Sequence, residues 1–444
     1  MSSNKSLKPT LGFFSLTNIV VANMIGAGIF TTSGLLMEEL GNPMLMLGLW
    51  LIGGLVAFAG AMSYGELGAT YPEAGGEYVF LSKLFHPSLG FLSGWVSFIV
   101  GFSAPIAASA IGISEYLMRT MTPEISEFQV QVLKKSISVT IILIFTLIHV
   151  RGMKLGSRFQ DVLTVLKVLL IVVLIFIGFL WGEGNWSHFS VNKDGPVTFG
   201  GIKSIGLSLM WIMFAYSGWN ASTYVGGEVR NPLKNLSRSL LIGTSVVALL
   251  YLLLNVLFVY ALSPSEMSGV ISIGGLTVNK LFGQSLDKVY SGFIAFALLS
   301  SLSAFIIIGP RVYYTMTKKR HFFTVASRVN RFNVPSISIF AQSALAIAFA
   351  VTGTFDQILT VLGFSLGVFP ILNVIGVFKL RMRGTGKLKL PGYPFIQVFF
   401  IFMSLAFLLL AFLERPVESS IAIGIILIGI PLYFLFVRGK RKKE

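Results

Sequence analysis

Two glycine-containing motifs interrupt long apolar segments of this 444-residue chain, and each could bind a small zwitterion. The first spans residues 26–30 (Gly-Ala-Gly-Ile-Phe) and the second spans residues 216–220 (Tyr-Ser-Gly-Trp-Asn). Glycine weakens a helix by about 1 kcal/mol relative to alanine, so the backbone is expected to unwind at both motifs. Freed N–H groups at the start of a half-helix can bind a carboxylate, and freed carbonyls can accept from an ammonium group. The alternative is that Gly26 and Gly28 only permit close helix packing.

Lys167 is the most informative single residue because it lies deep inside a predicted membrane helix, about eleven residues and roughly 16 Å from its start. A lysine at that depth is costly unless it is neutral or partnered, which predicts a functional role. Its ammonium could bind carbonyls near Gly26 and a hydroxyl such as that of Ser301, or it could release a proton and couple transport to protons. The alternative is that its side chain extends to the membrane surface.

Acidic residues lie near the ends of the predicted membrane helices, and none is found near the middle of one. A dedicated cationic substrate would require a buried carboxylate partner, so the sequence favours substrates with neutral side chains. The acids at the helix ends are candidates for gates, with ordinary interfacial charge as the alternative. They are Glu66, Asp161 and Glu228 on one side and Glu38 and Glu115 on the other.

Aromatic residues surround the second motif. Phe214, Tyr216 and Trp219 could close over a bound ligand, although aromatic residues at helical spacing more often pack in a core. Asn220 could hydrogen-bond a substrate or cap the broken helix. These side chains are therefore candidates only because the glycine break lies among them.

Catalytic and metal-binding motifs are not evident, so the chain is not expected to be an enzyme or to bind a cofactor or metal. Residues 363–367 (Gly-Phe-Ser-Leu-Gly) match a nucleophile-elbow pattern, but they lie within a predicted membrane helix and are better explained as a packing face. The four histidines show no ligand spacing, and the absence of cysteine excludes disulfides and thiolate sites.

The composition predicts an all-α membrane protein. Hydrophobic residues make up 54% of the chain and charged residues 12%, whereas soluble proteins carry about 25% charged residues. A spanning helix needs about 20 apolar residues, and twelve blocks satisfy this requirement. They lie near 11–39, 44–70, 88–117, 134–150, 155–182, 203–229, 239–262, 289–317, 335–353, 356–380, 394–413 and 417–437.

The positive charge is distributed between these blocks. The net charge is +16, but the basic residues do not gather on one domain, which argues against nucleic acid as a partner. They concentrate in alternate loops and near the C-terminus, at 151–158, 230–238, 318–331, 379–389 and 438–443. Short cytoplasmic loops hold the excess of lysine and arginine, so both termini are predicted to be cytoplasmic.

The two motifs occupy corresponding positions in two groups of five helices. An odd number of helices per group forces the second group to enter from the opposite side, which predicts an inverted repeat with a transport site at its interface. The predicted organisation is a cytoplasmic tail (1–10), a first repeat (11–182), an inverted second repeat (201–380), two extra C-terminal helices (394–437) and a basic cytoplasmic tail (438–444).

Five motifs, in order and in the appropriate helices, carry a family resemblance. They lie at residues 26–30, 64–78, 160–167, 214–220 with Glu228, and 309–313. Over nearly its full length the chain resembles the amino acid, polyamine and organocation superfamily. It is most similar to prokaryotic relatives of the L-type amino acid transporters.

The resemblance implies a LeuT-type fold with a five-plus-five inverted repeat, alternating access and usually sodium-independent exchange. It assigns the substrate carboxylate to the backbone around Gly26 to Gly28 and the amine to carbonyls near Ile25 and Phe214. It also implies a gating role for Phe214 and a structural or coupling role for Lys167 and Ser301. The implied substrate-binding residues, together with those of the two motifs, are Ile25, Gly26, Ala27, Gly28, Ile29, Phe214, Ala215, Tyr216, Ser217, Gly218 and Asn220.

The chain departs from animal members of this family in two respects. It lacks the cysteine that links them to a glycoprotein partner, which predicts that it works as a single chain, as a monomer in the lipid bilayer of the cell membrane. Ser303 stands where many relatives have asparagine, which leaves the side-chain preference open.

The predicted function is exchange of small neutral L-amino acids such as alanine, serine or threonine, with proton-coupled uptake through Lys167 as the alternative. A channel would require a continuous polar lining, and a membrane enzyme would require a set of catalytic residues. Neither is evident in this sequence.

Overall fold

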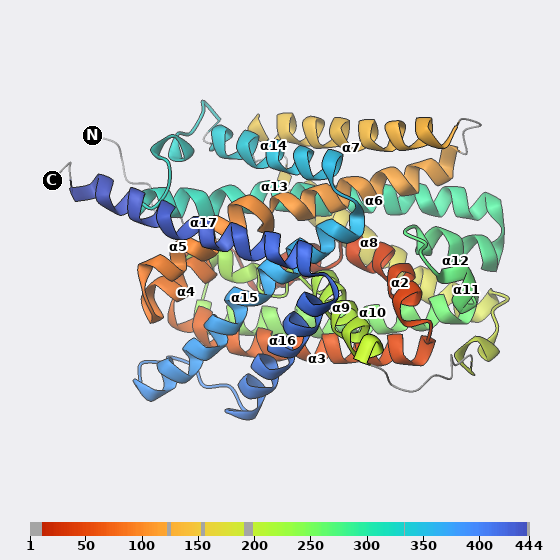
Figure 1. The fold of residues 1–444 in the computed structure, drawn as a ribbon, viewed down its shortest axis with the longest axis horizontal. Helices are drawn as coiled ribbons and strands as arrows, with labels where there is room; N and C mark the ends of the chain where they lie inside the picture. The colour runs from red at the N-terminus through yellow and green to blue at the C-terminus, as the bar shows by residue number, and fades with distance from the viewer. Residues whose placement is uncertain (1–10, 122–125, 152–155, 191–198, 333, 442–444) are drawn as a thin grey trace.

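The computed structural model describes residues 11–121, 126–151, 156–190, 199–332 and 334–441, and these residues form an all-helical protein (Figure 1). No β-strand occurs among them, and only two isolated β-bridges connect extended residues. The predicted N-terminal tail (1–10) and the last three residues of the predicted basic tail lie outside the described residues. So do Lys154 and Lys193, which contribute to the predicted charge distribution.

Seventeen α-helices and five short 3-10 or π segments follow one another along the described chain. In order they are α1 (Phe13–Met24), α2 (Ala27–Leu40), α3 (Pro43–Thr70), α4 (Glu77–Leu84), α5 (Pro87–Val96), η1 (Ser97–Gly101), α6 (Ser103–Met121), α7 (Glu127–Val150), α8 (Gly156–Trp181), η2 (Trp186–Ser190), α9 (Phe199–Ala215), η3 (Ala221–Tyr224), η4 (Gly226–Glu228), α10 (Pro232–Ala261), α11 (Pro264–Met267), α12 (Ile273–Phe282), α13 (Gln284–Lys318), η5 (Thr324–Ser327), α14 (Ser336–Thr352), α15 (Phe355–Met382), α16 (Phe395–Glu414) and α17 (Pro416–Arg441).

Each of the twelve predicted blocks coincides with helix, and ten spans in the described residues are long and apolar enough to cross a membrane. The two remaining apolar helices, α9 and α14, are shorter. The prediction of helix over 203–229 was partly wrong, because α9 ends at Ala215 and is followed by turns, η3 and η4. The molecule is therefore a multi-pass α-helical membrane protein.

Local sequence signals begin and end several of these helices. Proline occupies the first turn of α3, α5 and α10, where its missing N–H would have no partner. Asn42 caps α3 by accepting from Leu45 N, and Ser126 with Gln129 forms a capping box on α7. Gly41 ends α2 with a left-handed φ of 58°.

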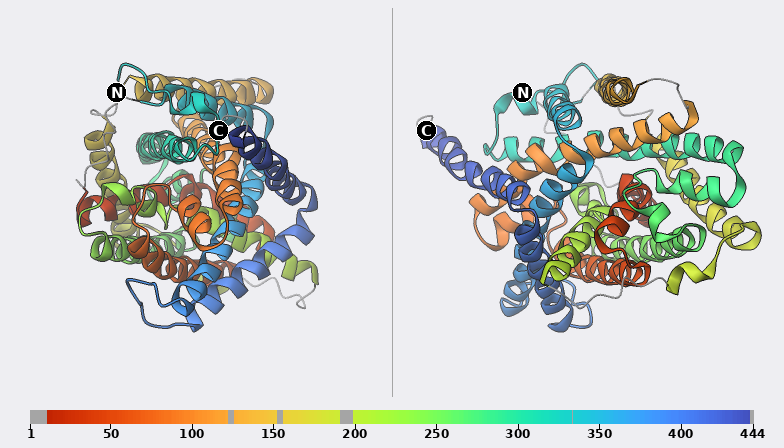
Figure 2. Two further views of the ribbon diagram at one scale, coloured as in Figure 1. Left: turned by 90° about the vertical axis from the view of Figure 1, so that its left-hand side faces the viewer. Right: turned by 45° about the vertical axis from the view of Figure 1, so that its right-hand side comes forward.

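Burial separates inner helices from outer ones. In the most apolar stretch of the α1–α2 span, 89% of the residues are buried. In the most apolar stretches of α7 and of α17, only 22% are buried. Figures 1 and 2 show α7 and α17 on the outside of the molecule in every view. Exposed and strongly apolar helices such as α7 and α17 face lipid. The α1–α2 span is buried, so its break lies within the protein and not at the lipid surface.

The interior is built from pairs of packed helices. α3 packs along α10, α6 packs along α13, and α2 packs against α9. α4 and α5 lie toward one end of the long axis in Figure 1, and α11 and α12 lie toward the other. Both predicted breaks are thereby placed among helices that are distant in sequence.

Candidate functional site

The first break separates α1 from α2 and is shorter than predicted. Only Ile25 and Gly26 leave the helical conformation, with Gly26 at φ −130° and ψ −155°, whereas residues 27–30 form the first turn of α2. Glycine has no side chain with which to cap a helix, so the first N–H groups of α2 receive no cap from Gly26. The start of α2 thus has the properties of an anion-binding helix terminus.

Lys167 of α8 reaches this break from the side. Its Nζ donates to Ala22 O at 2.8 Å, to Ile25 O at 2.5 Å and to Ser301 Oγ at 3.0 Å. Ser301 Oγ also donates to Ile25 O at 2.9 Å, so both lone pairs of that carbonyl are engaged. The Lys167 side chain is 1% exposed, which is incompatible with extension to the membrane surface. Ile25 O is therefore not free to bind a substrate amine in this structure.

Tyr251 of α10 joins the two breaks and was not anticipated from the sequence. Its hydroxyl lies 2.5 Å from Met24 O at the end of α1 and 3.1 Å from Ala215 O at the end of α9. Helix ends leave carbonyls without intrahelical donors, and a buried carbonyl needs a partner. The single proton of this phenol is thus shared between one such carbonyl in each broken span.

Two glycines hold the broken spans against each other. A Cβ on Gly28 would lie 2.5 Å from Ala215 Cα, and a Cβ on Gly218 would lie 2.7 Å from the carbonyl carbon of Asn23. Gly218 also has a φ of +100°, which residues with a side chain rarely adopt. The packing explanation for Gly28 is therefore supported by its contact with Ala215, in addition to its place in the first turn of α2.

The second break is longer and more open. After α9 ends at Ala215, residues 216–220 form turns that continue into η3 and η4. Ser217 N donates to Phe214 O at 2.8 Å, and Ala221 N donates to Gly218 O at 2.9 Å. These short-range bonds satisfy part of the backbone without restoring a helix. We refer to residues 216–220 below as the unwound segment.

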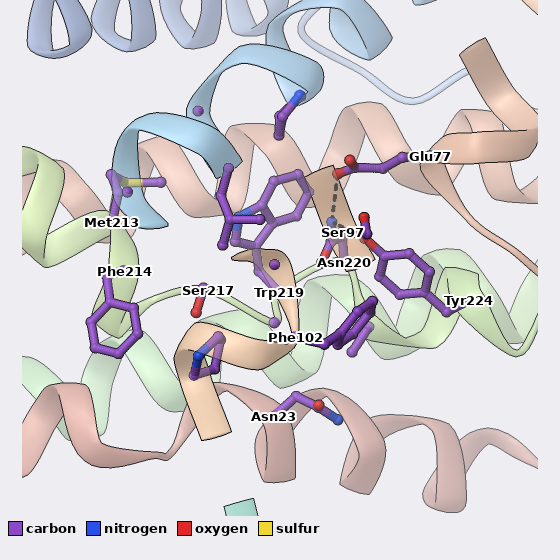
Figure 3. Close-up of a pocket in the computed structure, with 18 of the residues that line it drawn as sticks. Asn23, Glu77, Ser97, Phe102, Met213, Phe214, Ser217, Trp219, Asn220 and Tyr224 are labelled. Atoms are coloured by element: carbon purple, nitrogen blue, oxygen red, sulfur yellow. Dashed lines mark hydrogen bonds between the residues drawn. The ribbon is translucent and has the colours of Figure 1, made fainter. Parts of the chain in front are cut away.

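A cavity of about 90 Å³ lies beside the unwound segment (Figure 3). It is small compared with the roughly 300–1,000 Å³ of sites for drug-sized ligands. Aromatic and apolar side chains form most of its wall, and a few polar groups project into it. The lining residues are Asn23, Glu77, Ser97, Gly101, Phe102, Pro105, Met213, Phe214, Ser217, Gly218, Trp219, Asn220, Ala221, Tyr224, Phe305, Ile308, Gly363, Leu366, Gly367, Pro370, Phe400, Ser404 and Phe407.

The predicted substrate-binding residues divide into two groups. Phe214, Ser217, Gly218 and Asn220 line the cavity. The others are buried around the contact between α2 and α9 and do not line it. These are Ile25, Gly26, Ala27, Gly28, Ile29, Ala215 and Tyr216. Among the predicted coupling residues, Lys167 and Ser301 contact the first break and Phe214 lines the cavity.

A π-helical turn forms another part of the cavity wall. η1 connects α5 to α6 within one span, and its Ser97 and Gly101 both line the cavity. Such π turns are often found at functional sites because they widen a helix locally. The sequence of this span shows no glycine pair or proline at η1 that would have predicted the turn.

Residues 363–367 lie inside α15, as predicted, and serve packing. A Cβ on Gly363 would lie 2.8 Å from Met210 of α9, and a Cβ on Gly367 would lie 2.8 Å from Leu408 of α16. Both glycines also line the cavity. Their small size allows α15 to approach the neighbouring helices while leaving space beside the unwound segment.

Glu77, the first residue of α4, brings to the cavity a carboxylate that the sequence did not single out. It lies between two predicted membrane blocks, yet it is 6% exposed and lines the cavity. Its Oε1 accepts from Asn220 Nδ2 at 2.9 Å (Figure 3). It also accepts from Tyr64 OH at 2.8 Å. Burial raises the pKa of Glu77 to about 7, although its hydrogen bonds act in the opposite direction.

Three of the five acids at the predicted helix ends form ion pairs with other segments. Glu66 of α3 binds Arg381 of α15, and Glu115 of α6 binds Lys134 of α7 at 2.8 Å. Glu228 lies 3.6 Å from Arg311 of α13. The side chain of Asp161 lies outside the described residues.

An additional ion pair joins Arg119 of α6 to Asp287 of α13 at 2.6 Å. The pairs of Glu66, Glu115 and Asp287 each connect two helices that pack against each other. Their positions are compatible with gates, a role that stays a prediction.

Comparison with known proteins places this architecture in a family. Residues 11–436 match the family model described as amino acid permease. The serine/threonine exchanger SteT of Bacillus subtilis is 28% identical, over 100% of this chain and 99% of the relative. The large neutral amino acids transporter small subunit 2 of Mus musculus is 27% identical, over 99% of this chain and 83% of the relative. The b(0,+)-type amino acid transporter 1 of Mus musculus is 28% identical, over 97% of this chain and 88% of the relative. The chain therefore belongs to the amino acid permease family, within the amino acid, polyamine and organocation superfamily.

Proposed function

We propose that this protein carries small neutral L-amino acids such as alanine, serine or threonine across the membrane, by exchange and alternating access. The observation that carries the proposal is the small cavity beside the unwound segment. Backbone groups of a broken helix can bind both charges of an amino acid, and unwound backbone within a membrane protein is tolerated where it is buried in protein or lines such a cavity. The names of three relatives support amino acids as the substrate class.

The size and chemistry of the cavity favour small neutral side chains. A volume of about 90 Å³ leaves little space beyond a small amino acid. The one carboxylate in the described lining, Glu77, already accepts from Tyr64, Asn220 and Ser93. Its oxygens are therefore largely engaged by the protein, which disfavours a cationic substrate side chain.

Sodium-independent transport is supported by the contacts of Lys167. Carbonyl and hydroxyl oxygens are the ligands that hard cations such as sodium would require. Here the Lys167 ammonium binds Ala22 O, Ile25 O and Ser301 Oγ. A fixed ammonium in that position supplies the positive charge that a sodium ion would otherwise bring.

The proposed architecture has twelve spans, with two inverted repeats of five and two extra helices. The packing of α3 along α10 and of α6 along α13 supports it, because these are the second and third helices of each repeat. Counterpart helices meet each other where a two-fold axis passes between the repeats. The match of two broken spans, α1–α2 and α9 with the unwound segment, supports it further.

In the cell we propose a monomer in the cytoplasmic membrane, with both termini cytoplasmic. The concentration of lysine and arginine in alternate loops supports this orientation. One relative is named a small subunit, but this chain has no cysteine with which to form a disulfide to a second subunit. The arrangement of its apolar helices supports transport and not catalysis.

Proteoliposomes test exchange directly. Vesicles loaded with unlabelled alanine should take up labelled alanine rapidly and in the absence of sodium, whereas empty vesicles should not. Uptake that is equally fast into empty vesicles and follows an imposed pH gradient would show proton-coupled symport instead. Uptake that does not saturate and is not competed by unlabelled alanine would reject a carrier.

A further inference from the structure

Glu77 is a buried carboxylate that faces the cavity without a cationic partner among the described residues. It begins α4, outside the candidate membrane spans, yet is 6% exposed. A buried charge without a counter-ion is costly, so such a group either binds several donors or takes up a proton. The surroundings of Glu77 permit both, because several groups donate to the carboxylate and one of its oxygens could carry a proton.

Three neutral groups donate to the two oxygens of Glu77, and they do so unequally. Oε1 accepts from Tyr64 OH at 2.8 Å and from Asn220 Nδ2 at 2.9 Å. Oε2 has only Ser93 Oγ, at 3.4 Å. A hydroxyl can rotate from donor to acceptor. A proton on Oε2 can therefore bind Ser93 Oγ while both bonds to Oε1 remain in place.

The surrounding helices contribute few groups that titrate. Tyr64 of α3 and Tyr224 of η3 face Glu77, and burial raises the pKa of Tyr224, so that phenol stays neutral near physiological pH. α5 contributes Ser93, and α15 contributes Asn373, which donates to Tyr64 OH at 3.0 Å. On α4 itself, Tyr78 bonds to His321.

The charged residues near Glu77 in the sequence bind elsewhere, since Lys83 pairs with Glu73. No described cation thus fixes the charge of Glu77.

We propose that Glu77 is a proton-binding residue of the transport cycle, which releases its proton when Asn220 contacts it and takes one up when the unwound segment moves away. This inference rests on the proposed function. Asn220 belongs to the same segment as Ser217 and Gly218, which line the cavity. Loss of the Asn220 donor removes a bond that stabilises the carboxylate, so a proton from cavity water binds Oε2, and it returns to water when the bond re-forms.

Reciprocity makes this inference measurable. If movement of the unwound segment changes the proton affinity of Glu77, then substrate that binds to that segment must change it as well. Burial raises the pKa of Glu77 to about 7 in the conformation described here, so the exchange of the proton would occur near physiological pH.

Infrared titration of the full-length purified chain tests the proposal without requiring transport. We expect a protonated-carboxyl band that appears as the pH falls through about 7 and is absent in Glu77→Gln. Alanine should shift the midpoint of this band. Glu73→Gln is the matched control, because Glu73 lies in the same connection, is half-exposed and pairs with Lys83. The control should keep both the band and its shift.

Each outcome decides the matter. The same band in wild type and Glu77→Gln would overturn the assignment, and a Glu77 band that alanine does not shift would overturn the link to substrate. In proteoliposomes, the rate of alanine exchange by wild type should change severalfold across the same pH range, whereas Glu77→Gln should show a flat pH profile. A wild-type chain that shows no exchange at any pH but retains the infrared band would count against the proposed function and not against the proton site.

Discussion

The two breaks in the membrane helices look alike in sequence but differ in how their free backbone groups are satisfied. At the first break, side chains of the protein hydrogen-bond to the free carbonyls. Ile25 O accepts from Lys167 and Ser301, and Met24 O accepts from Tyr251. At the second, the unwound segment lines the cavity. One break is thus held by fixed internal donors, and the other borders the cavity.

This difference teaches that a glycine break alone does not identify a binding surface. The surrounding helices decide whether the freed groups are bound internally or left accessible. It also suggests a division of roles, in which the first break is a fixed support and the second is the part that responds to substrate. The following predictions test that division.

Lys167→Ala should have the largest effect. It removes three hydrogen bonds to buried oxygens at the first break, and each buried acceptor left without its donor costs about 1–3 kcal/mol. We expect transport to fall at least about tenfold, since 1.4 kcal/mol already corresponds to a factor of ten. Uptake into proteoliposomes and thermal unfolding in detergent measure both effects. Lys83→Ala, at a half-exposed lysine, should change neither. Normal kinetics in Lys167→Ala would remove Lys167 from the mechanism.

Gly218→Ala should have the next largest effect. The new Cβ would lie 2.7 Å from the Asn23 backbone, and the position has a φ of +100°. Overpacking and backbone strain together are expected to cost about 2–4 kcal/mol. Thermal unfolding and uptake should both show the loss. The matched control is Gly48→Ala in α3, where a Cβ meets no atom within 4 Å. Equal stability of the two variants would contradict the close contact between the breaks.

Tyr251→Phe should have a smaller effect that reaches both breaks. It removes the hydroxyl shared by Met24 O and Ala215 O, and a buried acceptor left without its donor costs about 1–3 kcal/mol. We expect a moderate loss of stability and a severalfold slower exchange. Tyr260→Phe, on the same helix, removes a weaker bond of 3.3 Å to Gly182 O and serves as the control. If Tyr251→Phe behaves like that control, the phenol does not couple the two breaks.

A further effect is expected on the pH dependence of stability. Burial raises the pKa of Glu77 from 4.5 to about 7, so the folded state holds a proton that the unfolded state loses first as the pH rises. This contribution makes the wild type progressively less stable as the pH rises from about 4.5 to about 7, and the loss persists above pH 7. Glu77→Gln lacks it and should therefore gain stability relative to wild type over that interval. Thermal unfolding at several pH values measures the difference, with Glu73→Gln as the control. Parallel curves for wild type and Glu77→Gln would show that the carboxyl does not titrate there.

Much of the fold could be predicted because lipid imposes a simple rule on sequence. Backbone groups in hydrocarbon must be satisfied within a helix, so membrane helices appear as long apolar blocks, and each predicted block overlaps a helix. Glycines marked both breaks, although the first proved shorter and the second longer than expected. Lys167 was identifiable because a charge inside such a block is conspicuous.

Residues outside these patterns could not be placed from sequence. Glu77 lies between two apolar blocks, where an acid is unremarkable, and only the packing of α4 beneath the unwound segment brings it to Asn220. Tyr251 is one aromatic residue among many in α10, and its role depends on two carbonyls that are 227 and 36 residues away.

The sequence by itself determined that the chain crosses a membrane repeatedly, where its helices break and which lysine is buried. Only the tertiary structure decided which break faces a cavity and which carboxylate reaches it. The physical reason is that a helical period and an apolar block are local properties. The partner of a freed carbonyl or a buried acid is supplied by segments distant in the chain.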